Sequence, residues 1–194
     1  ILLAQSTYLR SRGGSLKLEH KVTPRLSLFV EGKDVYQDFT PTAVVPLAAQ
    51  RSGIEVTGAI GADYRLMPSM KAGLSYTHGI KHAQRNINAF NRELLSANHI
   101  WLLGRGNFLY SYFDFYNDWY PHPDLFISSQ YRRDRAWRAG FNYGMPLTFV
   151  SQALKDFTWT LNYEYYQSVS SIINYSYTNN KVQTLLTYKW DLGL

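Results

Sequence analysis

The residues of this chain best suited to chemistry are its histidines. His78 and His82 are four positions apart, so on a strand they would share one face and could both approach an ion. Two neutral imidazoles without a carboxylate make a poor metal site, however, and the same spacing fits two histidines near a loop. We therefore predict no metal site and no cofactor.

A nucleophile with a neighbouring base is the second possibility. Ser96 and His99 lie three apart in "LLSANHIW", and some lipid-degrading enzymes use a Ser and a His close in space. Residues three apart on a strand point to opposite faces, so this pair cannot act within one strand, although a neighbouring strand could supply a base. Asp114 and Glu164 are expected to pair with Arg138 or Lys17 rather than to act as acid and base. We predict no catalytic residues.

Composition narrows the classes of protein further. The net charge of +6 would permit nucleic-acid binding, but the charges are scattered and no nucleic-acid motif is visible, so we expect no such partner. The absence of cysteine excludes disulfides and thiolate metal sites. No stretch approaches the length of apolar residues that a transmembrane helix needs. The 16% share of aromatic residues favours strands.

The elements that would position these residues are strands with one apolar and one polar face. Apolar and polar residues alternate with period two, which predicts half-buried strands. The clearest segments are 16–22, 26–33, 54–66, 71–77, 137–147, 157–165 and 182–194; segments 94–103 and 108–116 are apolar or aromatic on both faces, and 1–10 shows no clean face.

The connections between these strands alternate in length. "VTPR" (22–25), "LMPSM" (66–70) and "LGRGN" (103–107) are tight turns, whereas 38–53, 81–92, 118–134 and 168–181 are long and polar. One connection, "TFVSQALKD" (148–156), lies on the short side and is expected to hold a small helix. Short turns at one end and long loops at the other are typical of bacterial outer-membrane barrels.

We therefore predict an all-β fold, an antiparallel transmembrane up-and-down β-barrel of about ten strands, as one domain over residues 1–194. The alternative is a soluble barrel or sandwich, which must enclose the large aromatic residues in a core. The chain starts without an initiator methionine or signal peptide, which we interpret as a mature form or a fragment. The strands would then be a whole barrel or the C-terminal part of a larger one.

The polar faces assign the candidate interior of this barrel. These residues would interlock as ion pairs in a small barrel or line an aqueous path in a larger one. They are Lys17, Glu19, Lys21, Glu31, Lys33, Glu55, Asp63, Arg65, Lys71, Arg138, Glu164, Lys189 and Asp191.

Two further groups of residues concern the membrane itself. Arg132, Arg133 and Arg135 lie in or beside a long loop, where guanidinium groups could bind the phosphates of lipopolysaccharide. The last strand has apolar residues at alternate positions from its end and must pair with the first strand to leave no open edge in lipid. We interpret Tyr188, Trp190, Leu192 and Leu194 as a signal for the barrel assembly machinery.

The last third of the chain also resembles a known family. Arg132, Arg133 and Asp134 enter a strand, and Ser171, Ile173, Tyr175 and Tyr177 precede the final one. This pattern is similar to the closing strands of TPR-linked bacterial outer-membrane proteins, such as the surface lipoprotein assembly modifiers. Leu194 stands where that family has Phe or Trp. The resemblance implies an outer-membrane barrel with a periplasmic partner or domain.

Three functions are compatible with these observations. The first is transport or export across the outer membrane of a Gram-negative bacterium. The second is a non-conducting barrel for adhesion or for anchoring another complex. The third is a barrel enzyme that modifies lipid.

Overall fold

The computed structural model describes residues 2–3 and 6–189 of the chain. Its described part contains a two-stranded piece, β1 (Leu2–Leu3) with β2 (Ser6–Thr7), and one nine-stranded sheet. The strands of that sheet are β3 (Leu9–Lys21), β4 (Leu26–Phe39), β5 (Gly53–Met67), β6 (Met70–Ala83), β7 (Phe90–Gly104), β8 (Asn107–Trp119), β9 (Arg133–Pro146), β10 (Phe157–Ser170) and β11 (Tyr177–Tyr188). None of the helices in the described part of the chain is long and apolar enough to cross a membrane.

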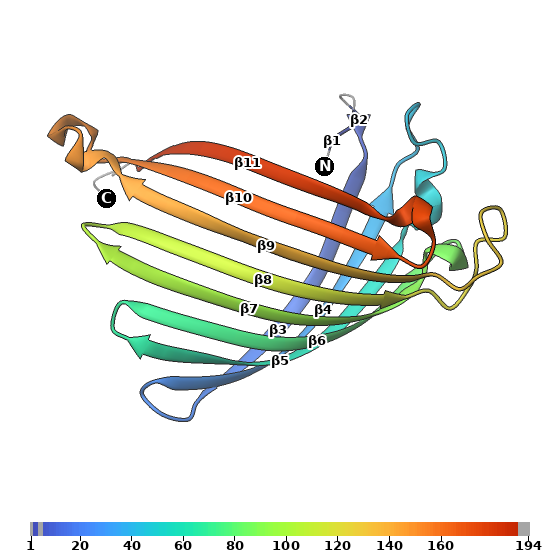
Figure 1. Cartoon of the computed structure of the whole chain (residues 1–194), viewed down its shortest axis with the longest axis horizontal. Coiled ribbons are helices and arrows are strands. Elements are labelled where there is room, and N and C mark those ends of the chain that lie inside the picture. The colour runs from blue at the N-terminus through green and yellow to red at the C-terminus, as the bar shows by residue number, and fades with distance from the viewer. Residues whose placement is uncertain (1, 4–5, 190–194) are drawn as a thin grey trace.

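The sheet is antiparallel throughout, and each strand pairs with its neighbours in the sequence, from β3 at one edge to β11 at the other. Figure 1 shows it curled into a trough, in which β3 and β4 cross behind the other strands in this view. The expected all-β, up-and-down antiparallel architecture is thus confirmed. The described sheet has nine strands rather than about ten and remains open.

The connections follow the predicted asymmetry of length. Short turns join β3 to β4, β5 to β6 and β7 to β8, and the long loops lie at the opposite end of the trough (Figure 1). In the turn from β7 to β8 the residues Gly104, Arg105 and Gly106 all have positive φ, of 87°, 52° and 78°. Glycine adopts this conformation without steric cost, which explains the two glycines there. The segment between β9 and β10 holds two 3-10 turns, η3 (Leu147–Phe149) and η4 (Gln152–Leu154), as expected.

The other short helices lie among the long loops. They are η1 (Ala48–Arg51), η2 (Asn86–Asn88) and η5 (Ile173–Tyr175). Most strands are longer than the alternation predicted, at 12 to 15 residues for β3 to β11, and the loops are correspondingly shorter.

The two faces of the sheet differ in chemistry and in exposure. Directly paired residues share a face, so the register places Leu18, Val30, Ile60, Tyr76, Leu95, Phe115 and Trp137 in one row. We call this apolar face the outer face. We call the opposite, polar face the inner face. On it, long side chains reach across one intervening strand to contact each other, as expected on the concave side of a trough.

The single-layered sheet buries few apolar side chains. Among the described residues only four hydrophobic side chains are buried: Ala48, Phe90, Ala136 and Ile172. Large apolar residues of the outer face are exposed, including Leu16 at 67%, Leu18 at 66%, Ile60 at 60% and Val182 at 71%. The buried polar and charged residues include Lys81, Asp114, Asp118, Thr160 and Ser168, all on the inner face.

Candidate functional site

The residues predicted to line an interior do share one face of the sheet. The register places them on the inner face of β3, β4, β5, β6, β9 and β10. On this face Lys17 lies directly opposite Glu31 on the neighbouring strand, and Asp114 directly opposite Arg138. Lys189 follows β11, and its backbone N–H donates to the Asp156 carbonyl oxygen at 2.8 Å. Asp191 lies outside the described residues. The set from Lys17 to Glu164 therefore shares the inner face of the sheet, and its role as the lining of a barrel interior stays a prediction.

One ion-pair network crosses β8, β9 and β10 on this face. The Arg138 guanidinium donates to Asp114 Oδ2 from Nε at 3.0 Å and from Nη2 at 2.6 Å. Its Nη1 lies 4.0 Å from Glu164 Oε2, which also accepts a 2.6 Å hydrogen bond from the Tyr112 hydroxyl. The network explains a glycine. Gly140 lies on β9, between β8 and β10, and a Cβ there would lie 2.7 Å from the Tyr112 hydroxyl oxygen.

A second network lies nearer the loops and involves residues that we had assigned to loops. Arg92 of β7 forms a two-pronged pair with Asp118 of β8, through Nε and Nη2 at 2.7 Å each. Its Nη1 lies 3.5 Å from Glu55 of β5. The Phe90 ring covers the guanidinium at 4.6 Å. Near the opposite end, Lys71 pairs with Asp63 at 3.0 Å. Carboxylates and cations therefore alternate across the inner face.

The loop end of the inner face contains a cleft of about 930 Å³. Its walls come from β4, β5, β6 and β7, from loops 40–52, 84–89 and 120–132, and from η5 and β11. Gln37 of β4 and Tyr177 of β11 line the same cleft, so the two sides of the trough approach each other there. We call this space the loop-end cleft.

Arg132 belongs to this cleft. Its guanidinium lies between the rings of Tyr120, at 4.1 Å, and Tyr175, at 3.6 Å, and it donates hydrogen bonds from Nε and Nη2 to the carboxylate of Asp134. Burial raises the pKa of the Tyr120 phenol, so the ring remains neutral beside the cation. Asp134 is 6% exposed. Arg132 is thus held by two rings and one carboxylate of its own chain.

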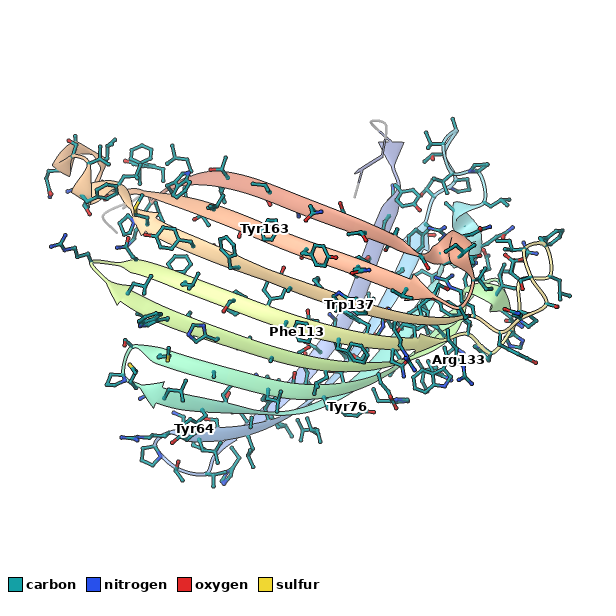
Figure 2. All side chains as sticks on the ribbon, viewed as in Figure 1. Tyr64, Tyr76, Phe113, Arg133, Trp137 and Tyr163 are labelled. Carbon is teal, nitrogen blue, oxygen red and sulfur yellow. The ribbon has the colours of Figure 1, made fainter. Side chains whose placement is uncertain are left out.

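Arg133 and Arg135 lie apart from Arg132. Both are exposed on the outer face at the loop end of β9, where Figure 2 labels Arg133. Together with Asn117, Trp119, Val169, Ser170 and Ser171 they line a hollow of about 480 Å³. We call it the rim groove. The three arginines that we expected to bind lipopolysaccharide phosphates are therefore divided between two sites.

The histidines offer one unexpected contact. Ser96 faces inward opposite Asp114, whereas His99 faces outward, and its Nδ1 lies 3.1 Å from Ser111 Oγ on β8. The same-face neighbours of His99 are Ala72, Ala97 and Trp101, so no carboxylate flanks the imidazole there. The described strands provide a Ser–His contact but no third group to orient it.

The remaining histidines do not converge. His78 and His82 both lie on the outer face of β6, about 13 Å apart at the rise of an extended strand. They cannot share one ion, which corrects the possibility raised by their spacing. The described residues hold no group of three or more His, Asp or Glu side chains that could bind a metal.

Comparisons of the chain with protein-family models, with curated proteins and with solved structures give no match.

Proposed function

We propose that this chain forms a transmembrane β-barrel, or the C-terminal part of one, in a bacterial outer membrane, and that it acts in transport or export. The observation that carries the proposal is the exposure of large apolar side chains along the whole outer face. Six of the outer-face side chains are labelled in Figure 2, and they come from β5, β6, β8, β9 and β10. Each large apolar side chain gains about 1.5–3 kcal/mol when it leaves water. Lipid supplies that environment for the whole face at once.

The distribution of tryptophan supports the same arrangement. All four tryptophans among the described residues lie on the outer face, within four residues of a strand end: Trp101, Trp119, Trp137 and Trp159. Phe113 and Phe141 lie nearer the middle of their strands. Membrane barrels carry aromatic girdles at both interfaces, where the indole N–H reaches water. Strands of 12 to 15 residues exceed the length of about 9–11 needed to cross a bilayer.

The open sheet favours a barrel with more strands than the nine described. In an up-and-down sheet the first and ninth strands run in the same direction, so β3 and β11 are parallel. Closing the sheet with antiparallel pairs alone requires an odd number of further strands between them. A second copy related by an axis along the membrane normal would again bring β11 against a parallel β3. Additional strands of the same barrel therefore fit the geometry best.

A wider barrel would leave a water-filled path along the charged inner face, which is why transport is preferred. The runner-up is a non-conducting barrel for adhesion or anchoring. It is favoured by the cross-strand networks of Arg138 and Arg92, which fill the inner face with paired side chains. The lipid-modifying alternative rests on His99 and Ser111 alone.

The positions of the rim groove and of the terminal strand suggest which partners the protein has. The rim groove, with Arg133 and Arg135, would receive phosphate groups of lipopolysaccharide, and Arg132 is excluded from that role because Asp134 already binds it. The barrel assembly machinery would read the terminal strand. The resemblance to TPR-linked barrels adds a periplasmic partner or domain.

Single-channel recording in planar bilayers tests the function. Discrete, reproducible conductance steps from the purified, folded protein would support transport. A folded protein that inserts without conducting would favour the anchoring alternative. Lipid hydrolysis that disappears on Ser111→Ala would favour the enzyme instead.

A further inference from the structure

The loop-end cleft holds more cations than its own carboxylates neutralise. Five cationic and two acidic side chains line it. Arg92 is neutralised by Asp118 and Arg132 by Asp134, each at hydrogen-bond distance. The other three cations, Arg51, Lys81 and Arg85, have no carboxylate within 4 Å among the described residues. Positive charge therefore remains in a partly enclosed space.

Lys81 is the most deeply placed of the three. The residue is only 8% exposed, and its ammonium donates one hydrogen bond, of 2.6 Å, to Gln37 Oε1. The rings of Phe39 and Phe90 lie 5.4 Å and 5.8 Å from Nζ. An ammonium has three donors, so within the described part of the chain two of them have no acceptor.

Arg85 is held in the same manner. Its Nη1 donates to Gln50 Oε1 at 3.0 Å, and its guanidinium lies 5.2 Å from the centre of the Phe126 ring. Amide oxygens and ring faces fix the position of a cation without cancelling its charge. Carboxylates would cancel it, as those of Asp118 and Asp134 do for Arg92 and Arg132.

The two acids that line the cleft compensate this charge only in part, since Glu55 attracts Lys81 electrostatically but forms no ion pair with it. Glu55 lies directly opposite Lys81 in the strand pairing, but its carboxylate is directed to Arg92. Asp124 Oδ1 accepts the backbone N–H of Phe126 at 3.3 Å. A buried cation without a counter-charge is costly, and a bound anion removes that cost.

We propose that the loop-end cleft is a binding site for a small organic polyanion, with Lys81 and Arg85 as the groups that contact its anionic groups. The cleft volume of about 930 Å³ admits a small polyanion with its body against the aromatic walls. This inference rests on the proposed transport function, for which it names the substrate class. Arg51, exposed at the end of η1, attracts the anion to the opening.

Calorimetric titration of citrate into the whole folded protein, in neutral detergent, tests the site without requiring conductance. We expect saturable binding that weakens with added sodium chloride, and no binding of the uncharged triamide of citrate. Lys81→Gln and Arg85→Gln should each weaken citrate binding by about tenfold, as expected for loss of a hydrogen bond between charged groups. Because Arg85 lies in a loop, its variant tests the site even if replacing buried Lys81 disturbs folding.

Lys33→Gln is the matched control, because it removes the same charge from the inner face of β4 outside the cleft. Equal weakening by Lys33→Gln, equal binding of the triamide, or no citrate binding at all would overturn the proposal. Conductance without citrate binding would reject this inference alone. Citrate binding without conductance would reject transport and retain the site.

Discussion

A single glycine determines whether the network on the inner face can form. A Cβ at Gly140 would lie 2.6 Å from the Tyr163 carbonyl oxygen and 2.7 Å from the Tyr112 hydroxyl oxygen. The hydroxyl reaches Glu164 only because this position has no side chain. Glycine inside a strand often marks such a close approach.

Gly140→Ala should therefore destabilise the folded protein by about 1–3 kcal/mol, the usual cost of overpacking. Gly32→Ala is the control, since a Cβ at Gly32 meets nothing within 4 Å. The temperature at which the compact, fast-migrating form disappears in gel electrophoresis measures both variants. Equal stability of the two would mean that the Tyr112–Glu164 contact does not constrain the sheet.

The three neighbouring arginines should give two different phenotypes. Replacing Arg133 and Arg135 with Gln removes the two cations of the rim groove, where no ion pair holds them among the described residues. Thermal stability should fall in lipopolysaccharide-containing vesicles and hardly change in neutral detergent. Arg132→Gln should lower it in both media, because the cation is stacked between Tyr120 and Tyr175 and paired with Asp134. The same response from both variants would rule out a separate lipid site.

At the scale of the strand, the sequence predicted the middle of each element better than its ends. Alternation identified 54–66 and 137–147 because apolar residues there face outward and polar ones inward. Towards the loops the outer face itself becomes polar, as His82, Glu93 and Arg135 show. The alternation then vanishes while the backbone pairing continues.

This loss of pattern explains which site residues were missed. Lys81, Arg92 and Asp118 fell inside predicted loops, although all three lie on strands and face inward. One signal was available: Asp118 lies an even number of residues from Asp114, and Lys81 an even number from Lys71, so each pair shares a face if the strand continues. Using this signal would have meant extending the predicted strands by about three residues. The cleft could not be predicted, because its walls come from segments as distant as β4 and η5.

The last strand supplies a prediction of its own. Tyr188 is 42% exposed on the outer face, and its ring packs against Phe157 at 4.8 Å. Tyr188→Asp should reduce membrane assembly, since a charge on the lipid face costs about 2–4 kcal/mol at the midplane and less at the rim. Trp190, Leu192 and Leu194 share the proposed signal but lie outside the described residues.

Thr187→Asp is the matched control, because it places the same charge one residue away on the inner face, opposite Thr158. The yield of the compact form in isolated outer membranes is the measurement. Normal assembly of the Tyr188 variant, or equal loss in both, would contradict the assignment of the outer face to lipid.

At the scale of the whole molecule, the question is what lies between β3 and β11. Direct pairing would place these parallel strands about 4.7–4.9 Å apart, close enough for facing cysteines to reach the Cβ separation of about 3.5–4.5 Å that a disulfide needs. One further strand between them would separate them by two strand spacings, about 10 Å. The chain has no cysteine, so an introduced pair would report this distance without background.

We expect no disulfide when cysteines replace outer-face residues of β3 and β11, such as Leu18 with Val182 or Leu16 with Val182, after mild oxidation of the assembled protein. Cysteines at Leu18 and Val30 are the positive control, because these residues are directly paired on β3 and β4. The cross-linked and open forms are resolved on a non-reducing gel. Because the register of a β3–β11 contact is not fixed in advance, the test scans Val182, Thr184 and Leu186 against Leu18. Efficient cross-linking at any of them would mean that the nine strands close on themselves through one parallel pair, and that the lumen is the narrow one in which Arg92 and Arg138 already occupy much of the space.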